Sequence, residues 1–106
     1  MKKIMLITDE GSHRLLYGRG LAKQFDIEFA SSASAAHATI DAVIYDLPNS
    51  PKPEDYKALE RLQIPIVILT PEIKLPLPKL SKGCVLQYPV GIDQMLQALI
   101  MIGVSP

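Results

Sequence analysis

Polar side chains of the kinds that bind cations or phosphoryl groups stand at the ends of three short apolar runs. They are Asp9 after residues 3–8, Asp46 at the end of residues 41–46 and Thr70 at the end of residues 65–70. If the three runs are parallel strands of one sheet, their carboxyl ends meet at one edge, where open α/β sheets bind their ligands. Two carboxylates and a hydroxyl there predict a magnesium or phosphoryl site.

The same acids could also have a purely structural role. Aspartate is a common turn residue and helix N-cap, so a single strand-ending aspartate usually only starts the next helix. Three polar ends on three apolar runs favour a shared site instead. Two interpretations of Asp9 and Asp46 are therefore retained: they stabilise loops, or they are the remains of a magnesium or phosphate site.

Composition limits the classes of protein that fit. The 106 residues make one domain, residues 1–106, and the 11 basic residues balance the 11 acidic ones. No overall charge therefore favours nucleic acid or an anionic membrane, and we expect neither as a partner. The single cysteine, Cys84, cannot form an internal disulfide, and no apolar run approaches the length of a membrane span. These features predict a cytoplasmic protein.

Short β-branched runs alternate with helical patterns, which is typical of βα units in a parallel sheet. We expect the first helix to have a loose middle, because Gly18 and Gly20 interrupt its pattern. Three prolines within residues 71–80 predict a short or irregular fourth helix. The expected strands are residues 3–8, 26–30, 41–46, 65–70 and 83–87, and the other expected helices are residues 31–40, 53–62 and 92–102.

This arrangement resembles the receiver domain of bacterial two-component response regulators over essentially the whole chain. The matching positions are Asp46 for the phosphoacceptor, Thr8-Asp9-Glu10 for the paired acids, Thr70 for the switch hydroxyl and Tyr88-Pro89 for the Lys-Pro pair. The resemblance implies an α/β fold, a flavodoxin-like three-layer α/β/α sandwich with a five-stranded parallel sheet of order 2-1-3-4-5. It also implies Mg²⁺ at Asp9 and Asp46, no enzymatic activity, and a histidine kinase, phosphotransfer protein or output domain as the protein partner.

Departures from the family pattern weaken the expected phosphoryl switch. Thr8 stands where the first metal-binding acid is expected, and Tyr88 replaces the lysine that would neutralise an acyl phosphate. The prolines in residues 47–51 and the aliphatic Val85 also depart from the pattern. We therefore expect a degenerate pseudo-receiver that acts through protein contact or dimerisation, with a weak Mg²⁺ site or none.

Two alternatives remain open at this point. The first is an active receiver that is phosphorylated on Asp46. The second is a small flavodoxin-like phosphocarrier or cofactor-binding protein. It is disfavoured because residues 8–12 offer no cysteine nucleophile after the first strand, and because their acids would repel a cofactor phosphate.

The last helix suggests where a partner would bind. Its apolar residues cover more than the single stripe needed for packing on a sheet, which predicts a dimer interface. The alternative is a helix that is buried more deeply than usual. The predicted interface residues are Met95, Leu99, Ile100 and Ile102.

The two histidines are His13 and His37. Neither has a second histidine or a cysteine at metal-ligand spacing, so a zinc site is not expected. Surface or capping roles are sufficient to explain both residues.

Overall fold

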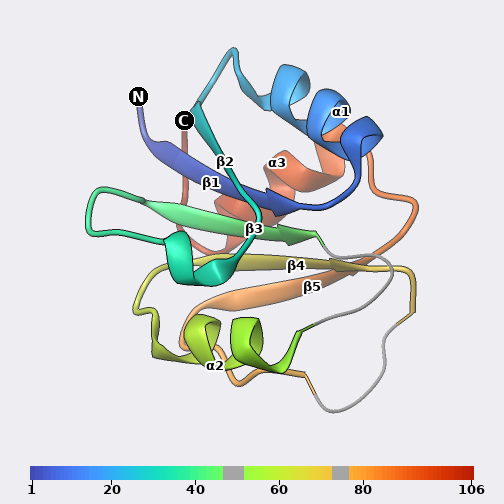
Figure 1. Cartoon of the computed structure of the whole chain (residues 1–106). Coiled ribbons are helices and arrows are strands. Elements are labelled where there is room, and N and C mark those ends of the chain that lie inside the picture. The colour runs from blue at the N-terminus through green and yellow to red at the C-terminus, as the bar shows by residue number, and fades with distance from the viewer. Residues whose placement is uncertain (47–51, 73–76) are drawn as a thin grey trace.

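The computed structural model describes residues 1–46, 52–72 and 77–106. The elements are β1 (Lys3–Thr8), α1 (Gly11–Leu21), β2 (Asp26–Ala30), the 3₁₀-helix η1 (Ala33–Ala35), β3 (Ala42–Asp46), α2 (Pro53–Arg61), β4 (Ile66–Thr70), β5 (Gly83–Gln87) and α3 (Ile92–Met101). The strands form a parallel sheet in the order β2-β1-β3-β4-β5 (Figure 1), which confirms the predicted topology. The predicted departure at residues 47–51 and part of the proline-rich crossover lie outside the described residues.

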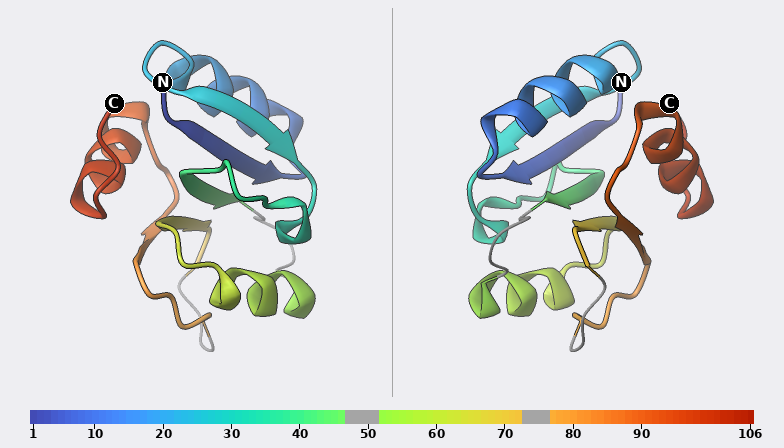
Figure 2. Two further views of the ribbon diagram at one scale, coloured as in Figure 1. Left: turned by 90° about the vertical axis from the view of Figure 1, so that its left-hand side faces the viewer. Right: turned by 90° about the vertical axis from the view of Figure 1, so that its right-hand side faces the viewer.

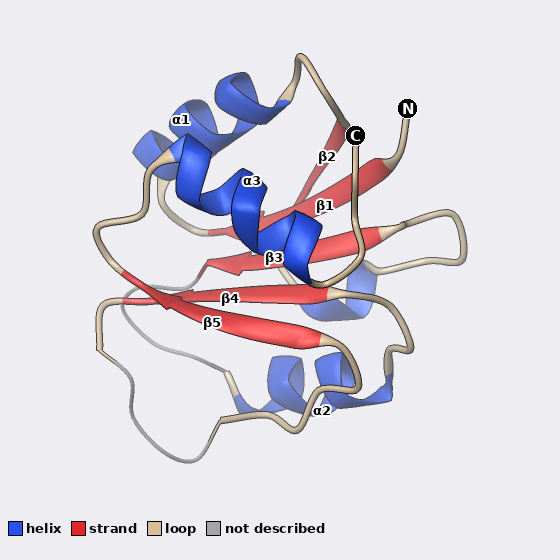
Figure 3. Cartoon of the chain, turned by 180° about the vertical axis from the view of Figure 1, so that it is seen from behind, coloured by secondary structure: helices blue, strands red, loops and turns tan. Residues whose placement is uncertain are grey.

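Helices cover both faces of the sheet. α1 and α3 lie on one face (Figure 3), and α2 lies on the side opposite α3 (Figure 2). Strand β1 shows how the alternation of side chains serves both layers: Ile4 and Leu6 pack beneath α1 and α3, whereas Met5 and Ile7 pack toward α2. Full burial of each such side chain contributes about 1.5–3 kcal/mol to stability. The three-layer sandwich is therefore confirmed.

The crossovers differ from the expected helices in two places. Residues 31–40 were expected to form only a short helix, and they contain the three-residue 3₁₀-helix η1 in place of an α-helix. Asp55 of α2 accepts hydrogen bonds from the Ala33 N–H at 2.9 Å and the Ser32 hydroxyl at 3.1 Å, which hold this segment against α2. Residues 71–72 and 77–82, the described part of the fourth crossover, contain no helix.

The two glycines of α1 act in packing and do not loosen the helix, which runs without interruption. A Cβ atom at Gly18 would lie 2.7 Å from Cζ of Phe29, and a Cβ atom at Gly20 would collide with the side chain of Ile92. Each glycine therefore allows close approach of a neighbouring side chain. The predicted loose middle of this helix is wrong.

Helix α3 presents its apolar residues mainly to the core. Met95 and Leu99 are fully buried, and Ile102, just after the helix, packs against the same cluster. Met95 and Leu99 are therefore unavailable to a partner, and the predicted interface is wrong for these two residues, whereas Ile102 is only partly buried. Ile100 is 46% exposed and stays a possible contact residue. Within the described ranges, no helix is long and apolar enough to cross a membrane.

Candidate functional site

The strand-ending polar residues meet at the carboxyl edge of the sheet, as the parallel topology requires. Thr8 of β1 and Asp46 of β3 are register partners in adjacent strands. Both are almost completely buried, with 1% and 0% of their surfaces exposed. The candidate site is centred on Asp46.

Within the described residues, one oxygen of the Asp46 carboxylate, Oδ2, accepts two hydrogen bonds. The Thr8 hydroxyl donates to Oδ2 at 2.7 Å, and Nδ1 of His13 donates to the same atom at 2.8 Å. The other oxygen, Oδ1, is buried and has no hydrogen-bond partner within the described residues. A buried carboxylate oxygen without a hydrogen-bond partner destabilises the folded state. Oδ1 is therefore an acceptor that a ligand or a water molecule could still use.

His13 was not among the residues predicted for this site. It lies in the first turn of α1, where the helix leaves the carboxyl edge of the sheet, and its imidazole reaches Asp46 across 33 positions of sequence. The ring packs edge-on against Tyr17 at a centroid distance of 5.6 Å and tilted against Tyr88 at 5.2 Å. The position of His13, five residues after the first strand and in the first turn of a helix that begins at the site, could have identified it from the sequence.

Burial dominates the electrostatics of the site. Loss of water raises the pKa of the Asp46 carboxyl above its ordinary value, and the nearby charge of Asp9 adds to the increase. The hydrogen bonds from Thr8 and His13, and the charge of His13, lower the pKa of Asp46 and so oppose this effect. The neighbouring side chains thus replace part of the lost hydration.

Tyr88 lies beside the site but not in its hydrogen-bond network. Its hydroxyl is buried without a hydrogen-bond partner among the described residues, and the peptide bond to Pro89 is cis. A tyrosine hydroxyl is a neutral donor, so Tyr88 supplies no positive charge at this edge of the sheet.

Thr70 is used locally. Its hydroxyl donates to the Glu72 carbonyl at 2.7 Å and accepts from the Glu72 N–H at 3.3 Å, so it stabilises the turn after β4. The structure therefore brings Thr8 and His13 to Asp46 and places Tyr88 against His13, whereas the hydrogen bonds of the Thr70 side chain are made to Glu72.

The described side chains do not fit a magnesium ion as they lie. Mg²⁺ needs near-octahedral oxygen ligands, and the described part of the chain contains no group of three acidic, histidine or cysteine side chains placed to hold a metal. Asp9 is exposed, and Oδ2 of Asp46 already accepts from Thr8 and His13. The site as described is an internally paired carboxylate.

Comparison with known proteins defines the fold. No protein-family model and no curated protein matches the chain. It is similar to the CheY-like receiver domain protein of Methanospirillum hungatei JF-1, with a TM-score of 0.76, 15% identity and coverage of 95% of this chain and 92% of that one. It is also similar to the chemotaxis response regulator CheY4 of Vibrio cholerae, with a TM-score of 0.73, 22% identity and coverage of 96% and 98%.

A third similar structure is of the response regulator TrrA from Thermotoga maritima in complex with Mg²⁺ and BeF. Its TM-score is 0.68 at 19% identity, and the match covers 96% of this chain and 99% of that one. The chain therefore has the CheY-like receiver fold, a flavodoxin-like α/β architecture.

Proposed function

We propose that the chain is a receiver-type signalling domain that has lost its phosphoryl switch and acts by contact with other proteins, without catalytic turnover of its own. The observation that carries this proposal is the pairing of Asp46 Oδ2 with the chain's own Thr8 and His13. The receiver fold supports the signalling role. The paired carboxylate supports the loss of the switch.

Access to Asp46 is the first supporting argument. A phosphoacceptor carboxylate must bring an oxygen to the phosphorus atom of its donor. Asp46 is completely buried, and exposing Oδ2 would require the chain to break two hydrogen bonds to a buried group. Breaking each such bond costs about 1–3 kcal/mol.

Charge compensation is the second supporting argument. An acyl phosphate adds negative charge beside Asp9 at an edge where Tyr88 is neutral and no described metal-binding group is present. His13 is the one side chain recorded in ion-pair geometry with Asp46 among the described residues, and a protonated imidazole there balances the bare carboxylate. In the described part of the chain, no second cation is paired with Asp46 that could compensate an added phosphoryl group.

An active phosphoacceptor is the second candidate, and one observation favours it. Asp46 Oδ1 and the Tyr88 hydroxyl are both buried without hydrogen-bond partners among the described residues, so two polar atoms near the carboxyl edge are free to meet a phosphoryl group. In that case a histidine kinase or phosphotransfer protein would be the partner, and Mg²⁺ would have to displace His13.

An amide NMR titration with Mg²⁺ and then beryllofluoride, a mimic of the acyl phosphate, separates these candidates. We expect no saturable shifts in the natural chain at Asp9, Asp46, Thr70 or Tyr88. The matched control is Thr8→Asp combined with His13→Ala and Tyr88→Lys, which restores the family's acid and lysine and removes the internal partner. We expect this variant to bind both reagents. Saturable shifts in the natural chain that spread to β5 and α3 would overturn the proposal.

A further inference from the structure

Three large apolar side chains that are about half exposed, Leu15, Leu16 and Phe29, lie on α1 and β2. We propose that this face is the contact between two copies of the chain in a two-fold symmetric dimer. The inference rests on the proposed function only in taking protein contact as the output. It uses none of the residues around Asp46.

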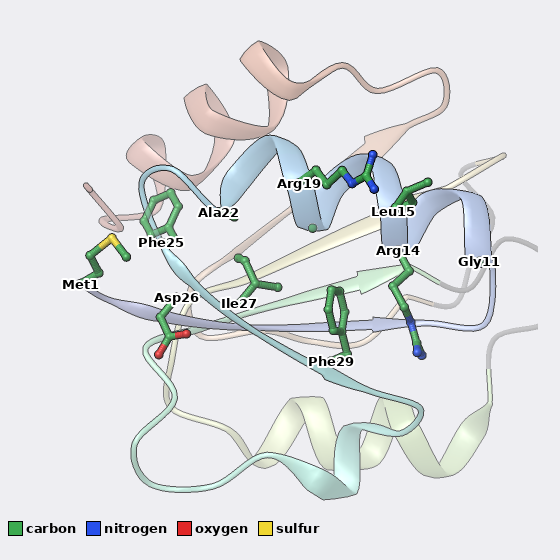
Figure 4. Close-up of a pocket in the computed structure, with 11 residues that line it drawn as sticks. Met1, Gly11, Arg14, Leu15, Arg19, Ala22, Phe25, Asp26, Ile27 and Phe29 are labelled. Atoms are coloured by element: carbon green, nitrogen blue, oxygen red, sulfur yellow. The ribbon is translucent and has the colours of Figure 1, made fainter.

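A hollow of about 600 Å³ runs between α1 and β2. Figure 4 shows Leu15 and Ala22 on its helix side, and Phe25, Ile27 and Phe29 on its strand side. Leu15 is 53% exposed and Phe29 is 45% exposed, although both are large apolar side chains. A largely apolar hollow with charged residues at its rim, here Arg14, Arg19 and Asp26, is typical of an interaction surface.

A projection that could fill the hollow lies on the same face. Leu15 and Leu16 are both about half exposed, and a second hollow, of about 550 Å³, lies on their other side and reaches Ile92. Leu15 and Arg19 line both hollows, so they form the ridge between them, and Leu15 supplies its apolar part. A two-fold interface needs a surface that is complementary to itself, and a ridge beside a hollow meets this requirement.

Charge on the rim of the first hollow has the same self-complementary arrangement. Asp26 lies at one end, where its carboxylate is 57% exposed and 3.9 Å from the Lys3 ammonium, and Arg14 lies at the other end beside Phe29 (Figure 4). Arg19 also lines the hollow, on its helix side. A two-fold axis through the middle of the hollow places the two ends of the hollow in the opposite order in the second copy. Asp26 of each copy then faces Arg14 of the other, which commits the hollow to a second copy.

The first test compares two substitutions of a half-exposed apolar residue by aspartate, one on α1 and one on α3. We expect sedimentation velocity over about 1–100 μM to show a concentration-dependent dimer, since weak interfaces associate in this range. Leu15→Asp should give a folded monomer. Ile100→Asp, on the half-exposed face of α3, is the matched control and should still form dimers. Circular dichroism checks that both variants are folded.

The second test exchanges the rim charges. Arg14→Glu and Asp26→Lys should each weaken self-association at least about tenfold, because each homodimer then places like charges opposite each other twice. An equimolar mixture should form heterodimers, since both contacts regain opposite charges. Native mass spectrometry separates the heterodimer from the homodimers.

Three results would overturn the dimer proposal. They are a natural chain that stays monomeric throughout the concentration range, a mixture that associates no better than the single variants, and dissociation by Ile100→Asp in place of Leu15→Asp. None of them bears on the titration of the Asp46 site, so failure of the dimer and failure of the proposed function are distinguishable.

Discussion

Nδ1 of His13 lies 2.8 Å from Oδ2 of Asp46, and this contact joins the first turn of α1 to the end of β3. The Thr8 hydroxyl reaches the same oxygen from β1, so one buried carboxylate oxygen connects three elements. A hydrogen bond to a buried charged group contributes about 1.5–3 kcal/mol. The site therefore stabilises the fold.

Replacement of Asp46 by asparagine should stabilise the protein at neutral pH. Burial raises the pKa of Asp46, so the folded state holds the proton more tightly than the unfolded state and stability falls as pH rises through the raised value. Asparagine keeps an acceptor for Thr8 and His13 and carries no charge. We expect a gain of about 1 kcal/mol at neutral pH, measured by urea unfolding.

The pH dependence provides the control for this prediction. The gap between Asp46→Asn and the natural chain should be smallest at about pH 3, where the carboxyl is protonated in both states, and should widen toward about pH 6. A gap that narrows as pH rises would show that the hydrogen bonds and the His13 charge outweigh burial.

Removal of the imidazole should destabilise the fold. His13→Ala leaves Oδ2 of Asp46 with only the Thr8 hydroxyl, so we expect a loss of about 1–3 kcal/mol in the free energy of unfolding. His13→Gln keeps a donor and should lose less. The loss in the free energy of unfolding caused by His13→Ala should be smaller when Asp46 is already asparagine. The reason is that no buried carboxylate charge is then left without its imidazole partner. Strictly additive effects would contradict a direct interaction.

Asp55 holds a second buried polar cluster whose removal should be costly. It accepts hydrogen bonds from the Ala33 N–H, from the Ser32 hydroxyl and, at 3.0 Å, from the Tyr45 hydroxyl. Asp55→Ala strands buried donors and should cost about 2–4 kcal/mol in thermal or urea unfolding. Tyr45→Phe removes one donor and leaves Asp55 its other partners, so it should cost about 1 kcal/mol. Equal losses in the two variants would contradict this ranking.

Two glycine-to-alanine changes should have opposite signs. A Cβ atom at Gly83 would lie 2.9 Å from the backbone oxygen of Ile66 in the neighbouring strand, so Gly83→Ala should separate β5 from β4 and cost about 1–3 kcal/mol. At Gly11, in the first position of α1, no atom lies within 4 Å of the added Cβ. Gly11→Ala should be neutral or stabilising by up to about 1 kcal/mol. Calorimetric melting temperatures of the two variants compare them directly.

Local pattern was sufficient to predict the sheet and the edge that carries the site. The runs that became β1, β3 and β4 are apolar and bounded by polar residues, which is what strands buried on both faces require. A short helix was predicted within residues 31–40 because they are small residues with some helical propensity. In the structure, Asp55 binds the start of this segment, which forms the 3₁₀-helix η1. That contact is made between segments 22 positions apart, which no local pattern records.

The chain's own residues thus determined the topology and the neighbourhood of Thr8 and Asp46, because the order of parallel strands sets which carboxyl ends are adjacent. Only the tertiary structure decided that His13 pairs with Asp46 and that Met95 and Leu99 are buried while Leu15 is exposed. Helical spacing shows which residues share a face, but the packing of the helix on the sheet decides which face is covered.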